Sequence, residues 1–235
     1  MDHPIVRNKN GLLRRMSDVD FALLVPNLRL RSLDIRQQLE TAGQPIGSVY
    51  FFESGIASVV ARNHPGLDTE VGVIGSEGMS ATALLMGADW STHDCYVQMI
   101  GAALCIDAEP FRAALDRSET LRLLLLRYVY YLQSQTRSTA LSNARGKLED
   151  RMARWLLMCD DRSVSDVINV THEFLSVMLG VRRPGVTICL QILEGRGLIW
   201  SKRGEITLRD REGLIRLADG YYGQAEADYL RLLGV

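Results

Sequence analysis

The chain has 235 residues, of which 47% are hydrophobic and 23% charged, and its formal net charge at pH 7 is −1. These values are ordinary for a globular protein with one large or two small domains. The N-terminal 20 residues lack the apolar stretch of a secretion signal, and the most apolar run, residues 121–132, is too short and too interrupted by arginine to span a bilayer. We therefore expect a cytoplasmic protein without a membrane partner.

The four cysteines are too widely spaced for a zinc knuckle, a redox pair or an iron–sulfur motif, so we expect four reduced, buried thiols. No GxSxG or HExxH motif occurs, and we expect no catalytic residue, no metal and no cofactor. His64 and His93 fall in the first third of the chain as single histidines, which is a weak pattern for haem. The cysteines are Cys95, Cys105, Cys159 and Cys189.

The first third of the chain predicts mainly β structure. Residues 17–43 favour short helices, one of them ending near Pro26. Residues 47–63, 69–79 and 95–108 are short runs rich in β-branched and aromatic residues, separated by glycines. Ser54-Gly55 is expected to divide the first of these runs into a hairpin. Together the runs predict a small β-barrel or sandwich.

A long helix is predicted from about residue 109 to residue 144, because this segment has no glycine and its one proline, Pro110, lies in the first turn. It is apolar all round, so both faces must be covered. We expect one face on the β domain and the other on a second subunit, with Leu125 and Leu132 at that contact. A core helix of a monomer is the alternative. Gly146 sets the expected boundary between domains 1–145 and 146–235.

Residues 170–199 predict a helix-turn-helix. Thr171 is a good N-cap, Gly180 suits the turn, and Gly195 and Gly197 end the second helix. Residues 197–210 predict two strands around Lys202-Arg203-Gly204, which form the wing of a winged helix-turn-helix. Asp210 can cap a helix that follows.

The second helix begins at Arg182-Arg183, although the N-terminal end of a helix favours anions over cations. Two arginines at this place indicate that an anion comes from outside the chain. Residues 137–209 carry 12 basic and 8 acidic side chains, the only section with a basic excess. Pro184 is tolerated in a first turn, while Gly185 costs about 1 kcal/mol of helix propensity and suits close approach of a partner.

This order of β domain, long helix and winged helix resembles the Crp/Fnr family of bacterial transcription regulators over nearly the whole chain. The resemblance is most specific at "GVRRPGVTICLQILEGRGLI" (180–199) and "VYFFESG" (49–55). It implies an α+β fold: an N-terminal jelly-roll sensor domain of the cyclic-nucleotide-binding type, a long dimerisation helix and a C-terminal winged helix-turn-helix domain. It also implies a homodimeric, sequence-specific DNA-binding protein.

By this resemblance Thr171 and Arg182 hold phosphates and Arg183 reads a base. The family's usual glutamate after that arginine is Pro184 here, so the operator sequence of other members does not transfer. The expected partners are double-stranded DNA with an inverted repeat, a second copy of the chain and, as a further candidate, RNA polymerase. The expected DNA-binding residues are Thr171, His172, Arg182, Arg183, Gly185, Thr187, Gln191, Lys202 and Arg203.

The sensor domain departs from members that bind cyclic nucleotides. Met79-Ser80 takes the place of their Gly-Glu pair, and His93-Asp94 takes the place of the Arg-Ser or Arg-Thr pair that holds the phosphate. The Asp94 carboxylate would repel a phosphate, and no arginine replaces the lost one, so we expect no binding of cyclic AMP. The effector is therefore unknown; the residues at the family's pocket positions are Met79, Ser80, His93, Asp94 and Thr136. An effector-binding module acting through protein contacts, with a degenerate DNA-binding domain, is the alternative function.

Overall fold

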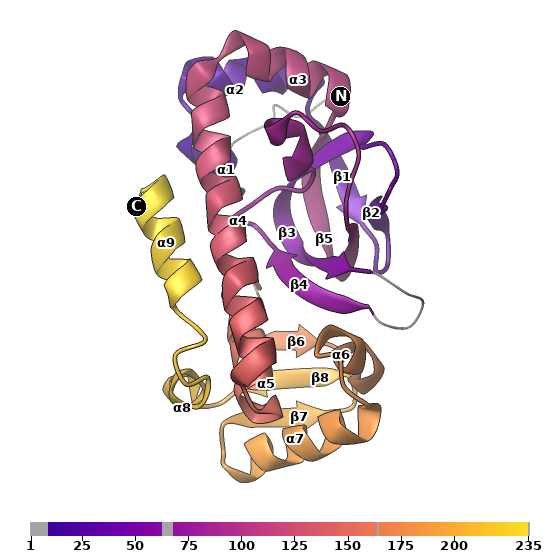
Figure 1. Ribbon diagram of the computed structural model, residues 1–235, viewed down its shortest axis with the longest axis vertical. Coiled ribbons are helices and arrows are strands. Elements are labelled where there is room, and N and C mark those ends of the chain that lie inside the picture. Colours follow the sequence, from indigo (N-terminus) through magenta and orange to yellow (C-terminus); the bar gives the residue numbers. More distant parts are fainter. Residues whose placement is uncertain (1–8, 63–67, 164, 235) are drawn as a thin grey trace.

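The computed structural model describes residues 9–62, 68–163 and 165–234. The N-terminal part holds two short helices, α1 and α2, a sheet and a helical pair, and the C-terminal part is a smaller unit of helices with a three-stranded sheet (Figure 1). The mixed α+β class and the order of the parts are as predicted. The N-terminal elements are α1 (Gly11–Arg15), α2 (Asp18–Leu24), η1 (Val25–Asn27), β1 (Arg29–Leu33), β2 (Gln38–Glu40), β3 (Ser48–Ala61), β4 (Thr69–Ile74), η2 (Thr82–Met86) and β5 (Asp94–Asp107).

The sheet is built on two long antiparallel strands, β3 and β5, with the order β1-β5-β3-β4 and with β2 also paired to β5. The hairpin predicted at Ser54-Gly55 is wrong, because β3 continues through these residues with shifts of register. Gly55 has φ +81°, and a Cβ on Gly101 of β5 would lie 2.2 Å from the Ser54 carbonyl oxygen. The two glycines therefore allow a bulge where the backbones approach closely.

The short helices predicted for residues 17–43 form only in the first part, where α2 and η1 end beside Pro26. Residues 29–33 and 38–40 form strands β1 and β2 instead. Arg29–Leu33 pairs along β5 over its whole length, with Leu33 buried and the other four side chains exposed. Pairing with a distant strand overrides the local helical preference here.

The single helix predicted from residue 109 to 144 is interrupted at Ser118. Two helices result, α3 (Ala108–Arg117) and α4 (Glu119–Arg145). Ser118 is extended, its Oγ accepts a hydrogen bond from the Leu121 N–H at 3.1 Å, and its hydroxyl bonds to Asp20 of α2. The serine therefore caps α4, and a bond to α2 fixes the turn between the two helices.

Helix α4 runs along the long axis of the molecule, with the sheet on one flank and α9 (Gln224–Leu233) on the other (Figure 1). The sequence had given no indication of α9. Its Tyr229 ring lies 4.9 Å from the Tyr131 ring of α4, and the Ser134 hydroxyl donates to Asp228 at 2.6 Å. The chain thus covers part of α4 that we had expected a second subunit to cover.

The C-terminal unit contains the predicted helix-turn-helix and wing. Strands β6 and β7 flank β8 in an antiparallel sheet. All four cysteines are free and buried, as expected. In the described residues no helix is long and apolar enough to cross a membrane. The elements are α5 (Leu148–Asp160), β6 (Val167–Asn169), α6 (His172–Met178), α7 (Arg183–Gly195), β7 (Ile199–Lys202), β8 (Glu205–Leu208) and α8 (Arg211–Leu217).

The two parts share a hydrophobic core. Ile56, Val60 and Val73 of the sheet belong to the same buried cluster as Met152 and Leu156 of α5. The position of the helix-turn-helix is therefore set by packing against the β domain as well as by α4.

Candidate nucleic-acid interface

Helices α6 and α7 form the helix-turn-helix at the lower end of the molecule (Figure 1). Thr171 is the N-cap of α6, and its Oγ1 accepts a hydrogen bond from the Phe174 N–H at 3.1 Å. Gly180 in the turn has φ +59°, as the sequence predicted for a turn glycine. Thr171 is exposed, so its hydroxyl hydrogen is still available to an acceptor outside the chain.

Arg182 and Arg183 lie at the exposed start of α7, Arg182 as the extended N-cap and Arg183 as the first helical residue. No side chain caps this helix end, and Pro184 contributes no N–H. The dipole of the 13-residue helix gives this end a partial positive charge, to which two guanidinium groups are added. Such an end binds phosphate well.

The outer face of α7 presents one exposed amide side chain and one exposed apolar side chain. Gln191 is exposed two turns after Arg183, and Ile188 between them is 57% exposed. Ile188 was not among the residues predicted from the sequence, although an apolar residue three before a glutamine on an exposed face could have indicated it. A Cβ on Gly185 would meet only Leu148 Cδ2, at an ordinary 3.6 Å, so the fold itself does not require glycine there.

His172 and Thr187 bond to each other and join α6 to α7. His172 Nδ1 lies 2.9 Å from Thr187 Oγ1, and the same hydroxyl donates to the Arg183 carbonyl at 3.3 Å. Both side chains are half-buried. Their geometry suits holding the start of α7 at a fixed angle to α6.

The wing carries two further cations. Lys202 ends β7 and lies with its Nζ 4.1 Å from the centre of the half-exposed Trp200 ring, and Arg203 follows in the turn before β8. The ring restrains the lysine without neutralising it. Gly204 completes the turn with φ +80°.

These basic residues lack acidic partners, whereas several arginines elsewhere in the chain have them. Arg62, Arg162 and Arg211, for example, each pair with carboxylates. Within the residues that the structure describes, none of the basic residues at the start of α7 or on the wing makes an ion pair. The set is Arg182, Arg183, Lys202 and Arg203.

Several residues at the family's effector positions make contacts within the chain. Met79 is fully buried, and its carbonyl accepts a hydrogen bond from the Tyr128 hydroxyl of α4 at 3.2 Å. A Cβ on the neighbouring Gly78 would lie 2.0 Å from that hydroxyl. Tyr128 therefore fills the space between this turn and α4. Ser80 Oγ accepts from the Tyr50 N–H at 3.1 Å.

Asp94 is buried and neutralised within the chain. Its Oδ1 accepts from the Ala42 N–H at 2.9 Å, and its Oδ2 lies 3.1 Å from Arg62 Nη1. Arg62 thus lies beside Asp94, a contact that the sequence did not indicate. Its guanidinium is already paired with the Asp94 carboxylate. His93 Nε2 lies 3.7 Å from Glu40 Oε2. Thr136 is exposed on α4, and His64 lies outside the described residues.

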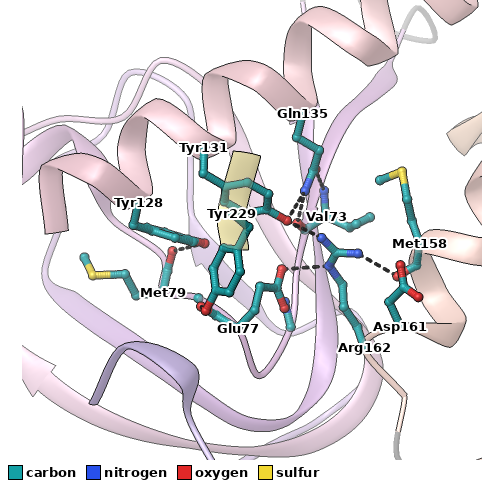
Figure 2. Close-up of polar contacts among 12 residues, drawn as sticks. Val73, Glu77, Met79, Tyr128, Tyr131, Gln135, Met158, Asp161, Arg162 and Tyr229 are labelled. Atoms are coloured by element: carbon teal, nitrogen blue, oxygen red, sulfur yellow. Dashed lines mark hydrogen bonds and ion pairs between the residues drawn. The ribbon is translucent and has the colours of Figure 1, made fainter. Parts of the chain in front are cut away.

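A polar network at the junction of the two parts was also missed by the sequence analysis (Figure 2). Arg162, just after α5, is 5% exposed and donates through Nε to Glu77 Oε1 at 2.7 Å and through Nη2 to the Tyr131 hydroxyl at 2.5 Å. Burial alone would lower the pKa of Arg162, but the Glu77 carboxylate raises it, so the guanidinium stays charged. Gln135 donates to the Tyr131 hydroxyl as well. This network joins α5, α4 and the turn after β4.

Comparison with known proteins agrees with this architecture. Residues 150–217 match the model of the Crp-like helix-turn-helix domain. The fold is similar to that of a protein from Eubacterium rectale described as a transcriptional regulator of the Crp/Fnr family, at 17% identity and TM-score 0.71, over 91% of this chain and all of that one. It is also similar to FixK2 from Bradyrhizobium japonicum, at 16% identity and TM-score 0.68, over 81% and 96% of the two chains. The comparison with curated proteins found no significant match.

Proposed function

Since the chain has a Crp-like helix-turn-helix domain within the fold of the Crp/Fnr transcription regulators, we propose that it is a homodimeric, sequence-specific DNA-binding regulator of transcription in the cytoplasm. The observation that carries the proposal is the set of four unpaired cations around one helix-turn-helix. Arg182 and Arg183 extend from the N-terminal end of α7, while Lys202 and Arg203 extend from the wing. In proteins of this architecture the second helix enters the major groove and neighbouring groups hold the backbone.

The roles follow from the position of each group. Arg183 begins the helix that enters the groove, where a guanidinium bonds to guanine O6 and N7. Arg182, Lys202, Arg203 and the free hydroxyl hydrogen of Thr171 lie where backbone phosphates pass. Ile188 offers an apolar contact for a thymine methyl group.

The proposed dimer uses an exposed stripe on α4. Leu123, Leu126 and Tyr130 are 49%, 37% and 49% exposed, at intervals of three and four residues. The same spacing continues through Gln133 and Arg137, and the Arg137 guanidinium lies 5.4 Å from the centre of the Tyr130 ring. This is the heptad spacing of a coiled coil, in which two copies of α4 would pack side by side.

This stripe differs from the subunit contact expected from the sequence, which contained Leu125 and Leu132. Leu125 is fully buried and Leu132 is half-buried, and both pack in the protomer's own core cluster. The residues proposed at the contact are therefore Leu123, Leu126 and Tyr130.

We also propose that cyclic AMP is not the effector. The Tyr128 side chain fills the space beside Met79, and Arg62 is held by Asp94, so neither room nor a free arginine remains for a cyclic phosphate there.

Selection from a pool of random duplexes tests the proposal. We expect enrichment of one inverted repeat with half-sites about 34 Å apart, which is one turn of DNA. Affinity for the enriched site should fall steeply with salt, because bound phosphates release counterions. A pool that shows no enrichment would contradict sequence-specific binding and favour a module that acts through protein contacts.

A further inference from the structure

A cavity of about 300 Å³ lies at the junction of the β domain, α4 and the C-terminal segment. Its walls come from four places in the sequence: the turn after β4, the middle of α4, the end of α5, and the segment that includes α9. This volume is at the lower end of the range for sites that hold small organic molecules. The expected DNA contacts on α7 and the wing do not line it.

The walls combine aromatic rings with acidic groups. Tyr131, Tyr222 and Tyr229 provide three rings, and Leu230 adds an apolar side chain that is 53% exposed. Tyrosine rings attract cations through their faces. Arg15 already lies over the ring of Tyr229, 5.3 Å from its centre, although it does not line the cavity.

The charges at the cavity do not balance. Glu77, Asp161 and Glu226 line it with only one cation, Arg162. Glu77 is paired with Arg162 at 2.7 Å, and Asp161 is paired with Arg211 outside the cavity at 2.5 Å. Glu226 Oε2 accepts the Gly223 N–H at 3.0 Å. This carboxylate lies near enough to Arg154 and Arg162 to favour their charged forms, but within the described residues it makes no direct ion pair.

We propose that this cavity binds a small organic monocation, an amine with an aromatic or short apolar body, and that this amine is the effector of the regulator. Glu226 supplies the opposite charge and the tyrosine rings and Leu230 enclose the apolar body. An anion is disfavoured because Arg162 is already neutralised by Glu77. The effector role rests on the proposed function, whereas binding in the cavity does not.

The position of the cavity explains why occupancy would change DNA binding. Tyr131 belongs to the helix proposed for dimerisation, Arg162 follows the first helix of the DNA-binding domain, and Glu77 belongs to the β domain. A ligand held between them binds one relative arrangement of the two parts better than others, and so shifts the population toward it.

Calorimetric titration of the full chain with phenethylamine, in the absence of DNA, tests the site. Its neutral and anionic counterparts, 2-phenylethanol and 3-phenylpropionate, serve as matched controls. We expect saturable binding of phenethylamine with a dissociation constant below about 5 mM, and binding of the two controls at least fivefold weaker. Absence of saturation up to about 20 mM, or equal binding of 2-phenylethanol, would overturn the proposal.

Two variants locate the bound probe. Glu226→Gln keeps an oxygen for the Gly223 N–H but removes the charge, and should weaken phenethylamine at least fivefold. Leu230→Trp should fill the opening and abolish binding. Glu212→Gln, an exposed position of α8 outside the cavity, is the matched control and should bind as the wild type does. Unchanged binding in both cavity variants places the amine elsewhere and contradicts the site.

The link to DNA is measured separately, as the change in affinity for the selected operator with and without saturating phenethylamine. We expect a change of at least threefold that Glu226→Gln abolishes. Amine binding without any operator binding would refute the proposed function but leave the cavity site intact. Operator binding that saturating amine does not alter would refute the effector role.

Discussion

The Trp155 indole N–H of α5 donates to Glu70 Oε1 of β4 at 2.8 Å, so a buried carboxylate stands at the contact between the DNA-binding domain and the sheet. The second oxygen, Oε2, has no hydrogen-bond partner in the described part of the protein. Burial raises the pKa of Glu70 to about 7, although the hydrogen bond from Trp155 acts in the opposite direction.

This contact predicts a stability that falls as pH rises. A folded-state pKa above the unfolded value means that the folded protein keeps the proton between about pH 4.5 and pH 7. Stability from this group is therefore full below pH 4.5 and is lost as pH rises through 7. Glu70→Gln should leave stability at pH 5 nearly unchanged and raise it at pH 8 by up to about 3 kcal/mol. Urea unfolding at the two pH values measures this, with Glu212→Gln as an exposed control; an equal pH dependence in wild type and Glu70→Gln would refute the assignment.

Dimer formation should depend on the outer stripe of α4. Leu126→Asp with Tyr130→Asp should give monomers at micromolar concentration, because two charges would be buried at the coiled-coil contact. Sedimentation measures the mass, and Val19→Asp, at a 74% exposed position of α2, is the control that should remain dimeric. A wild-type protein that sediments as a monomer would contradict the proposed dimer.

The paired arginines should behave differently. Arg183→Ala should cost about 1–3 kcal/mol on the operator and relax preference at one base of each half-site. Arg182→Ala, Lys202→Ala and Arg203→Ala should weaken all sequences alike and reduce the salt slope by about one per subunit. Arg196→Ala removes the same charge at the far end of α7 and serves as the control. Equal losses on operator and random DNA for Arg183→Ala would refute base reading.

The Arg162 network should be worth more to stability than a surface ion pair. Arg162→Met leaves the Glu77 carboxylate without its partner at a mostly buried place, and should lower the free energy of unfolding by about 3 kcal/mol. Adding Glu77→Gln removes the unpaired charge and should restore part of the loss. Urea unfolding of both single variants and the double variant gives the coupling; additive losses would mean that the pair contributes nothing beyond its separate members.

Cyclic nucleotides should not bind the sensor domain of the wild-type protein. Calorimetry with cyclic AMP and cyclic GMP should give no dissociation constant below about 1 mM, which corresponds to about −4 kcal/mol. Micromolar binding would mean that the Tyr128 side chain leaves its place beside Met79, and that the alignment of Met79-Ser80 with the family's Gly-Glu pair is mistaken.

Local signals predicted the C-terminal unit well. Its caps and turns depend on contacts within about four residues, so the sequence alone places them. Examples are Thr171 as a cap, Gly180 in the turn and Gly204 in the wing. The bulge at Gly55 could not be predicted, because its cause is the approach of Gly101, 46 positions away. The strands at residues 29–40 likewise depend on their pairing with β5.

The candidate site was predictable only in part. The positions of Arg182 and Arg183 followed from the boundary between two helices, but their lack of acidic partners is a property of the assembled surface. The cavity could not be foreseen, because Glu77, Arg162 and Tyr229 are brought together from distant segments. Leu125 and Leu126 are neighbours in sequence, and only packing decides that one faces the core and the other solvent.

Helix α9 gives the DNA-binding domain a second attachment. The chain enters that domain after Gly146 at the end of α4, and after Gly223 it returns along α4 to α1, where Arg15 Nε donates to the Gly234 carbonyl at 3.0 Å. A body tethered at one point can swing in any direction, whereas one tethered at two points turns most freely about the line that joins them. Any large movement of the reading helix should therefore be a rotation about a single axis through these two glycines.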